Sequence, residues 1–125
     1  MNEIYTKYPE SFDRYTTIRM THNGFPVGYA RLIREENVVT IADMFIYDRV
    51  KQPVKFLPWF KIYRNYRNRG HGSQLLNNVI NYCMKQGILE IIGVAKGELA
   101  ALKPWYMRHG FNVNENNEIY LKLNA

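Results

Sequence analysis

The chain contains very little cysteine and no long apolar run. Its one cysteine, Cys83, cannot form an intramolecular disulfide, which is typical of proteins from reducing compartments. No apolar run approaches the roughly 18 residues that cross a bilayer, and no N-terminal segment resembles a signal peptide. We therefore expect a cytoplasmic protein that has no membrane partner.

Acidic residues are absent from residues 49–89, a stretch that carries eight basic ones. The rest of the chain is close to balanced, with nine basic against eleven acidic residues. A one-sided positive field attracts a polyanion, but its sign does not distinguish a nucleotide cofactor from nucleic acid or an anionic membrane. A solvated basic loop is the structural alternative that charge alone leaves open.

Length and composition favour one folded domain. Hydrophobic residues make up 46% of the chain and aromatic residues 14%, which is typical of a globular protein. A chain of 125 residues can bury one core but is too short for two independent cores. We therefore interpret residues 1–125 as a single domain.

The first half of the sequence predicts an antiparallel meander. Asn23-Gly24 separates two strand-like runs, residues 15–21 and 26–34, and Asn-Gly is a strong hairpin signal. A second reversal precedes a third run at residues 38–47, which is rich in β-branched and aromatic residues. Before this meander, the first dozen residues predict only a short helix or an irregular arm.

The second half predicts a strand, a helix and a strand. Residues 48–55 predict a polar loop, and residues 56–63 a strand that Pro58 leaves bulged or unpaired on one side. Apolar periodicity predicts a helix over residues 74–86, with Gly87 as its stop. The apolar run at residues 88–94 is typical of a strand in a parallel pair, so we expect it to form a crossover unit with residues 56–63.

The end of the chain predicts a second helix and a hairpin. The helix covers residues 98–108 and is expected to be interrupted or restarted near Pro104. Residues 118–123 alternate apolar and polar side chains, which predicts the last strand.

A basic, glycine-punctuated turn precedes the first helix, and it reads Arg67-Asn68-Arg69-Gly70-His71-Gly72-Ser73. Between a strand and a helix, such a turn directs backbone N–H groups and the positive end of the helix dipole at one point. The glycines permit torsions and close approach that a side chain would obstruct. The turn therefore predicts a phosphate site, although its spacing fits neither the P-loop nor the dinucleotide fingerprint.

Two segments carry a resemblance to a known family. The pattern Arg-x-x-Gly-x-Gly in residues 62–76, with its pair of leucines on the following helix, resembles the acetyl-coenzyme A motif of the GNAT superfamily of N-acetyltransferases. About 30 residues further on, Trp105-Tyr106-Met107-Arg108-His109-Gly110-Phe111 is similar to the element that follows the last core helix of the family. The resemblance covers about residues 15–123.

The resemblance implies an α/β fold of the GNAT type. It would have a mixed, mainly antiparallel sheet with a splayed parallel strand pair flanked by helices, and a shortened N-terminal helical region. The implied function is the transfer of an acetyl group from acetyl-coenzyme A (acetyl-CoA) to a primary amine by direct attack on the thioester. The acceptor amine, a small molecule or a protein, is left open, as is the oligomeric state, with a homodimer among the options.

The resemblance also implies roles for particular residues. Backbone groups of Phe60 and Ile62 on the splayed strand would pair with the pantetheine arm. Tyr106 would protonate the departing thiolate, a role that suits a phenol O–H at the rim of an apolar slot. The pyrophosphate would be held by the backbone amides of Arg67, Asn68, Arg69, Gly70, His71, Gly72 and Ser73.

Other candidate groups receive structural interpretations. Residues 56–63 contain no carboxylate, so Asp43 or water is expected to take the proton of the amine. Ser73 is interpreted as a helix N-cap, and Cys83 as a packed, inert thiol. His22 and His109 have no second ligand at a useful spacing, so no metal site is expected.

Two alternatives to an acetyltransferase remain open. The first is a binding module that keeps the cofactor slot without catalysis, suggested by Leu99, where many GNAT members place a cofactor-contacting asparagine. The second is a nucleic-acid-binding protein that uses the basic, aromatic-rich residues 51–69. Nucleic acid is the less expected partner of the two.

Overall fold

The computed structural model describes residues 4–10, 12–46, 49–54, 57–65, 70–96 and 99–123. Its strands are β1 (Ile4–Lys7), β2 (Tyr15–His22), β3 (Phe25–Glu35), β4 (Val38–Ile46), β5 (Arg49–Val54), β6 (Leu57–Asn65), β7 (Glu90–Val94), β8 (Asn112–Val113) and β9 (Glu118–Lys122). The helices are α1 (His71–Lys85) and α2 (Leu99–Arg108).

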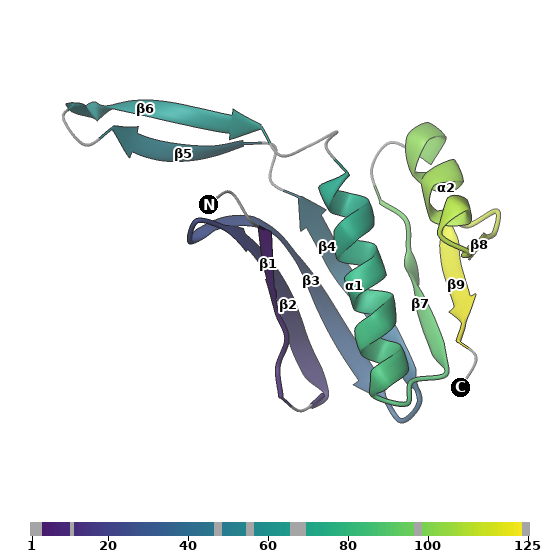
Figure 1. Ribbon diagram of the computed structural model, residues 1–125. Helices are drawn as coiled ribbons and strands as arrows, with labels where there is room; N and C mark the ends of the chain where they lie inside the picture. Colours follow the sequence, from purple (N-terminus) through teal and green to yellow (C-terminus); the bar gives the residue numbers. More distant parts are fainter. Residues whose placement is uncertain are drawn as a thin grey trace.

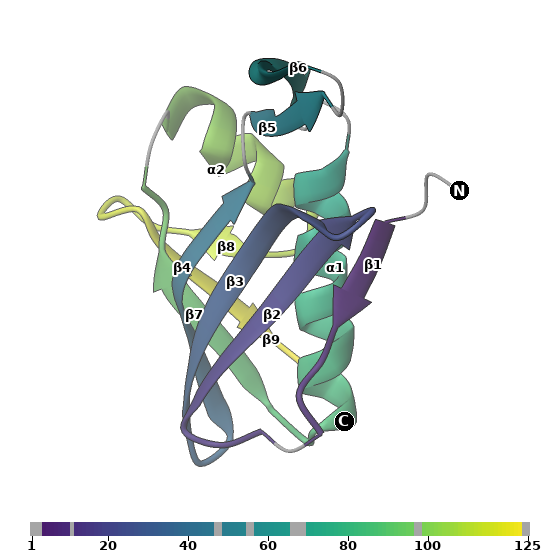
Figure 2. The same ribbon diagram turned by 90° about the vertical axis from the view of Figure 1, so that its left-hand side faces the viewer.

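Seven of these strands form one mixed sheet in the order β1-β2-β3-β4-β7-β9-β8. Every neighbouring pair in it is antiparallel except β4 and β7. Figure 1 shows α1 lying along this sheet, and Figure 2 shows β2, β3 and β4 side by side. The predicted fold class, a mainly antiparallel sheet with one parallel pair and flanking helices, is confirmed.

The Asn23-Gly24 turn confirms the predicted β2–β3 hairpin. Both residues have positive φ, 52° and 81°, which is the conformation that a tight two-residue hairpin requires. The next reversal uses Glu36, whose φ is 55°, and leads into β4 as expected. Local turn chemistry therefore determines the meander.

The core lies between α1 and one face of the sheet. Alternate residues of β2 and β3 are fully or almost fully buried, as are the apolar positions of α1: Ile18, Met20, Ala30, Leu32, Leu75, Leu76, Val79 and Cys83. This is the stripe that the helical periodicity predicts. The helix begins at His71, three residues before the predicted start, and Gly87 follows it with a φ of 76°.

The prediction for the first residues was wrong, because Ile4–Lys7 forms an edge strand that pairs antiparallel with β2. Contacts with α1 fasten this segment. Asn78 Nδ2 donates a hydrogen bond to Thr6 Oγ1 at 2.9 Å, and the Tyr82 hydroxyl donates to the Pro9 carbonyl at 3.0 Å. These partners are more than 70 residues away in sequence, so local periodicity could not indicate them.

The parallel pair opens because β4 contains a bulge. Arg31 of β3 pairs with Asp43, whereas the next residue, Leu32, pairs with Ile41, so Ala42 is the extra residue. The parallel pairing with β7 ends at Ile41 and Gly93, while β4 continues to Ile46. A bulge bends its strand and increases the local twist. We call the point after Ile41 and Gly93, where β4 and β7 separate, the fork.

The strand predicted as the parallel partner of β7 lies elsewhere. β6 pairs with β5 in a separate two-stranded antiparallel sheet, so the predicted polar loop at residues 48–55 is also wrong. This hairpin projects beyond the end of the main sheet where β4 ends and α1 begins (Figure 1). The crossover therefore runs from β4 through the hairpin and α1 to β7.

The helix α2 continues through Pro104, contrary to the predicted interruption. A proline removes the hydrogen bond to the carbonyl four residues earlier, and here that carbonyl belongs to Ala100 in the first turn of the helix. The loss therefore falls at an end of the helix, where backbone groups are already incompletely paired.

The anchoring of the N-terminal strand can be tested with Tyr82→Phe. The change keeps the ring stacked on Tyr8, at 5.4 Å between centroids, and removes only the hydroxyl that donates to Pro9. We expect the free energy of unfolding to fall by about 1 kcal/mol in urea titrations, with faster amide exchange in β1. Tyr15→Phe, at a position that is 68% exposed, is the matched control and should change neither quantity. Equal stability and exchange in both variants would contradict the anchoring role.

Candidate active site

The glycine turn leads directly into α1. Gly70 is the N-cap residue with a φ of 79°, and the first helical backbone hydrogen bond runs from the amide of Gln74 to the carbonyl of Gly70 at 3.0 Å. The amides of His71, Gly72 and Ser73 therefore lie in the first turn, where N–H groups have no partner within the helix. No acidic side chain occurs in that turn. This arrangement has the backbone donors and the helix dipole of an anion site.

Part of the predicted phosphate turn lies outside the described residues, namely Arg67, Asn68 and Arg69. Their roles stay predictions. Gly72 is close to α2, since a Cβ added there would lie 3.5 Å from the Trp105 ring. The start of α1 and the face of α2 are therefore in contact at the site.

Ser73 is not the helix cap that the sequence suggested. It is the third residue of α1, and its Oγ accepts a hydrogen bond from Trp105 Nε1 at 3.0 Å. His109 Nε2 lies 3.1 Å from the same oxygen, and His109 Nδ1 lies 3.2 Å from Asn77 Oδ1. Ser73 and Asn77, in the first two turns of α1, thus form hydrogen bonds with residues at the end of α2 and directly after it. Trp105 and His109 follow Ser73 by more than 30 residues in the sequence. Local sequence could therefore suggest only a capping role for Ser73.

The protonation state of His109 follows from its surroundings. Burial, and then the positive charge of Arg108, lower the pKa of His109. The neutral ring satisfies the whole network if Nδ1–H donates to Asn77 and Nε2 accepts the hydroxyl proton of Ser73. The contact between α1 and α2 therefore favours an uncharged imidazole.

Tyr106 lies on the same helix, between Trp105 and Phe111. Its ring packs edge-on against theirs, with centroids 4.8 and 5.5 Å apart, and the residue is 7% exposed. Burial raises the pKa of Tyr106, so the phenol is protonated at neutral pH. No hydrogen bond from the Tyr106 hydroxyl occurs among the described residues. A protonated, uncommitted phenol can donate its proton to a ligand.

Tyr106 lines a pocket of about 530 Å³ at the fork. Ile41 and Val94 lie at the separating strands, and the bulged part of β4 forms one wall. The described residues that line it are Arg31, Ile41, Ala42, Asp43, Met44, Phe45, Val94, Lys96, Tyr106 and Ile119. We call it the fork pocket. It places the candidate acid beside the part of β4 that has no strand partner on its β7 side among the described strands.

Asp43 is the one carboxylate among the described residues that line the fork pocket. It accepts a hydrogen bond from the Tyr29 hydroxyl at 3.0 Å and one from Arg31 Nη2 at 2.9 Å. Its position beside Tyr106 agrees with the sequence hypothesis of a base from this strand. Its two bonds show that the carboxylate is already partly engaged.

Phe60 and Ile62 do not lie at the fork. Both belong to β6, so their predicted place in the parallel pair is wrong, while their contact with a cofactor stays a prediction. Met44 and Phe45 line the fork pocket instead, and sequence reasoning did not select them. The available signal is the apolar run at residues 38–47, which predicts one strand of the meander, with Asp43 as its only candidate site residue.

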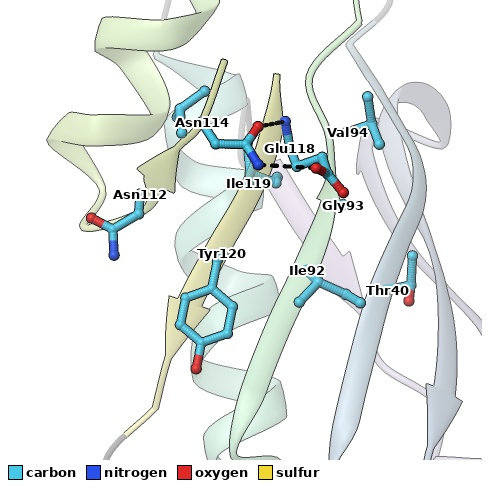
Figure 3. A pocket seen from close by; sticks show the side chains of 10 residues that line it. Thr40, Ile92, Gly93, Val94, Asn112, Asn114, Glu118, Ile119 and Tyr120 are labelled. Atoms are coloured by element: carbon cyan, nitrogen blue, oxygen red, sulfur yellow. Dashed lines mark hydrogen bonds between the residues drawn. The ribbon is translucent and has the colours of Figure 1, made fainter. Parts of the chain in front are cut away.

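A second hollow, of about 440 Å³, lies over β7, β8 and β9 (Figure 3). Its polar rim is internally bonded, because Asn114 Nδ2 donates to Glu118 Oε1 at 2.9 Å and Asn114 Oδ1 accepts the Glu118 amide at 2.9 Å. It shares Val94 and Ile119 with the fork pocket. We assign the chemistry to the fork pocket, which contains Tyr106.

The remaining groups to consider are the thiol of Cys83 and possible metal ligands. Cys83 is fully buried, and desolvation raises the pKa of its thiol to about 12, so it is a packed thiol as predicted. Among the described residues, no three His, Cys, Asp or Glu side chains gather as metal ligands. Neither described helix is long and apolar enough to cross a membrane.

The Acetyltransferase (GNAT) family profile matches residues 2–111. The chain belongs to the GNAT family of acetyltransferases. This confirms the resemblance on which the sequence interpretation rested. No curated protein sequence matches the chain significantly.

Solved GNAT structures share the fold at low sequence identity. The ribosomal-protein-S18-alanine N-acetyltransferase from Escherichia coli is 18% identical, with a TM-score of 0.70 over 100% of this chain and 96% of that one. A Bacillus subtilis acetyltransferase in complex with CoA is 14% identical, with a TM-score of 0.69 over 98% of this chain and 100% of that one.

A third solved structure is longer than the part of it that this chain matches. The PaiA N-acetyltransferase from Thermoplasma acidophilum, in complex with coenzyme A, is 16% identical and has a TM-score of 0.65. The match covers 88% of this chain and 62% of the Thermoplasma protein. The shared part is the GNAT fold described above.

The contact between α1 and α2 predicts a pH-dependent stability. Because the pKa of His109 is lower in the folded than in the unfolded chain, its stabilising contribution is complete above the unfolded value near 6.5. It is lost as the pH falls through the folded value. We expect the difference in free energy of unfolding between the parent and His109→Gln to shrink from pH 7.5 to 5.5. An NMR titration should give a His109 midpoint below 6.5, and a midpoint above it would contradict the assignment.

Proposed function

We propose that this GNAT protein transfers an acetyl group from acetyl-CoA to a primary amine by direct attack on the thioester. The observation that carries the proposal is Tyr106, a protonated phenol in the fork pocket. The amide-rich start of α1 is joined to the same helix by Ser73 and His109. The GNAT family and the CoA in two of the structural relatives support a CoA thioester as the acyl donor.

The reaction needs one acid and one proton acceptor. The amine lone pair attacks the thioester carbonyl carbon, the C–N bond forms, and the C–S bond then breaks. Tyr106 would give its proton to the departing thiolate, and the proton released from the amine nitrogen would pass to water, which returns a proton to the phenolate. Asp43 is a second candidate acceptor, but its bonds to Tyr29 and Arg31 favour water.

The cofactor would lie along the start of α1 and the open edge of β4. The amides of Gly70, His71, Gly72 and Ser73, with those of residues 67–69, would bind the pyrophosphate. At residues 42–44, the β7-side edge of β4 has no strand partner among the described strands, and its backbone groups could pair with an extended pantetheine arm. We retain the backbone groups of Phe60 and Ile62 on β6 as a second candidate contact for this arm.

A cofactor-binding module without catalysis is the second candidate function. The observation that favours it is the engagement of Asp43 by two donors, which leaves the described lining of the fork pocket without a carboxylate that is free of protein hydrogen bonds. The module would use the same first turn of α1 and the same open edge of β4.

Gly70 provides a test of the phosphate site with an internal control. Gly70 and Gly24 have φ values of 79° and 81°, and an added Cβ would meet nothing within 4 Å at either. Each change to alanine should therefore lower the free energy of unfolding by about 1 kcal/mol through backbone strain. Only Gly70→Ala should also weaken coenzyme A binding in calorimetry, by about tenfold, because it disturbs the first turn of α1. Equal affinity in the two variants would place the cofactor elsewhere.

Tyr106→Phe separates an enzyme from a binding module. The ring packing remains, so coenzyme A affinity should be unchanged while acetyl transfer falls by about 10²- to 10⁴-fold. Since the pKa of Tyr106 is raised, this group should cause no loss of rate below about pH 10. Tyr120→Phe, in the second hollow, is the matched control.

Three outcomes of this experiment are informative. Unchanged turnover in Tyr106→Phe would remove this tyrosine from the mechanism. A parent protein that binds coenzyme A but acetylates no amine in a broad panel would favour the binding module. Failure to bind coenzyme A would contradict both functions.

A further inference from the structure

The face of the sheet opposite the core carries a row of polar side chains across three strands. Thr17 of β2 pairs with Arg31 of β3, and Arg31 pairs with Asp43 of β4. Arg19 pairs with Tyr29 in the neighbouring row. These residues alternate with the buried residues that face α1, so they lie on the outer face.

Two hollows on this face share Arg31. One is the fork pocket, which reaches Tyr106. The other, of about 300 Å³, is lined by Thr17, Arg19, Tyr29 and Arg31. Among the described residues, the combined linings contain three cations and one carboxylate, namely Arg19, Arg31 and Lys96 against Asp43. The described side chains on the way to the candidate acid therefore have a net positive charge.

Arg31 is held in place by its neighbours. Its Nη2 donates to Asp43 Oδ2 at 2.9 Å and to the Tyr29 hydroxyl at 3.3 Å, and its guanidinium lies 5.1 Å from the centre of the Tyr29 ring. Both hydrogen bonds come from the same nitrogen, Nη2. Its Nε and Nη1 donors have no partner among the described residues. A guanidinium that is fixed on one side and open on the other is pre-organised to bind an anion.

Arg19 supplies a second positive charge that no described residue neutralises. It is exposed, and no ion pair or hydrogen bond of its side chain occurs in the described part of the chain. The Thr17 hydroxyl lines the same hollow and can donate a hydrogen bond. Two guanidinium groups beside a hydroxyl favour a carboxylate or a phosphate over any other ligand class.

We infer that the acceptor is an amine that also carries a carboxylate or a phosphate, and that Arg19 and Arg31 bind this anionic group while the amine enters the fork pocket. The inference rests on the proposed acetyl transfer. The anion site lies one to two strand spacings from Asp43, roughly 5 to 10 Å. The acceptor therefore separates its two charged ends by a chain of several atoms.

The same arrangement disfavours other amines. A diamine or a lysine-rich segment would bring further positive charge beside Arg19, Arg31 and Lys96, and like charges repel in a partly enclosed hollow. An amine with an uncharged tail would leave both guanidinium groups unused. Among amines of equal chain length, the preference should therefore follow the charge of the tail.

The test uses four amines of equal chain length and different tails. These are 6-aminohexanoate, 6-aminohexyl phosphate, hexylamine and 1,6-diaminohexane, assayed at saturating acetyl-CoA. We expect at least one anionic amine to have a KM about tenfold or more below that of hexylamine, with the diamine the poorest. The anionic amine with the lower KM identifies the carboxylate or the phosphate as the natural group.

Arg19→Gln isolates the anion site. It should raise the KM for the preferred anionic amine about tenfold at similar kcat, and leave the KM values for hexylamine and acetyl-CoA unchanged. High salt should reduce the difference between parent and variant. Arg14→Gln is the matched control, because Arg14 is an exposed arginine in a separate ion pair with Glu35 at 3.8 Å. The control should behave like the parent with all four amines.

The outcomes separate this inference from the proposed function. If acetylation occurs but the four amines have equal KM values, or Arg19→Gln changes none of them, the anion site is wrong and the acetyltransferase stands. If no amine is acetylated, the two anionic amines are titrated into the coenzyme A-saturated protein and followed by NMR. Shift changes at Thr17, Arg19 and Arg31 that disappear in Arg19→Gln would support the anion site, and their absence would overturn it.

Discussion

The fork between β4 and β7 is the constraint on which the rest of the site depends. Backbone pairing between parallel strands would normally continue to their ends, but the extra residue Ala42 changes the course of β4 after Ile41. The separation leaves backbone groups open at the edge of β4 and makes room for Tyr106 from α2. A continuous parallel pair would leave no space there for a thioester.

The contacts between α1 and α2 fix the position of Tyr106 relative to the start of α1. Ser73 belongs to the first turn of α1, whereas Trp105 precedes Tyr106 on α2 and His109 directly follows this helix. A shift of α2 would break these hydrogen bonds, so the phenol and the amide site keep a fixed relation. Direct attack gains its rate mainly from positioning, and a rigid link of this kind supplies it.

The parts of the structure that sequence could predict are those with local causes. Asn23-Gly24 requires a tight turn, the apolar stripe of α1 requires one buried face, and Gly87 follows the end of the helix. Strand partners have no such local cause. Both β4 and β6 precede the glycine turn, and either could be the parallel partner of β7. The sequence favours β6, which is nearer to the turn, but in the structure β7 pairs with β4 and β6 pairs with β5. The motif that contains Tyr106 spans few residues and is therefore visible in the sequence, while the catalytic role of Tyr106 stays a prediction. The partners of Ser73 were missed because they are distant in sequence.

Each face of the sheet has its own candidate anion site. In the proposed reaction, one anionic substrate would meet the start of α1, whose first turn has no acidic side chain, whereas Arg19 and Arg31 lie on the outer face. Two anions bound on one face would repel each other in a shared low-dielectric space. In the proposed reaction, the sheet would lie between the two anions, and only the uncharged reacting ends would meet at the fork. A neutral phenol would then suffice there as the acid, next to a carboxylate that already pairs with Arg31.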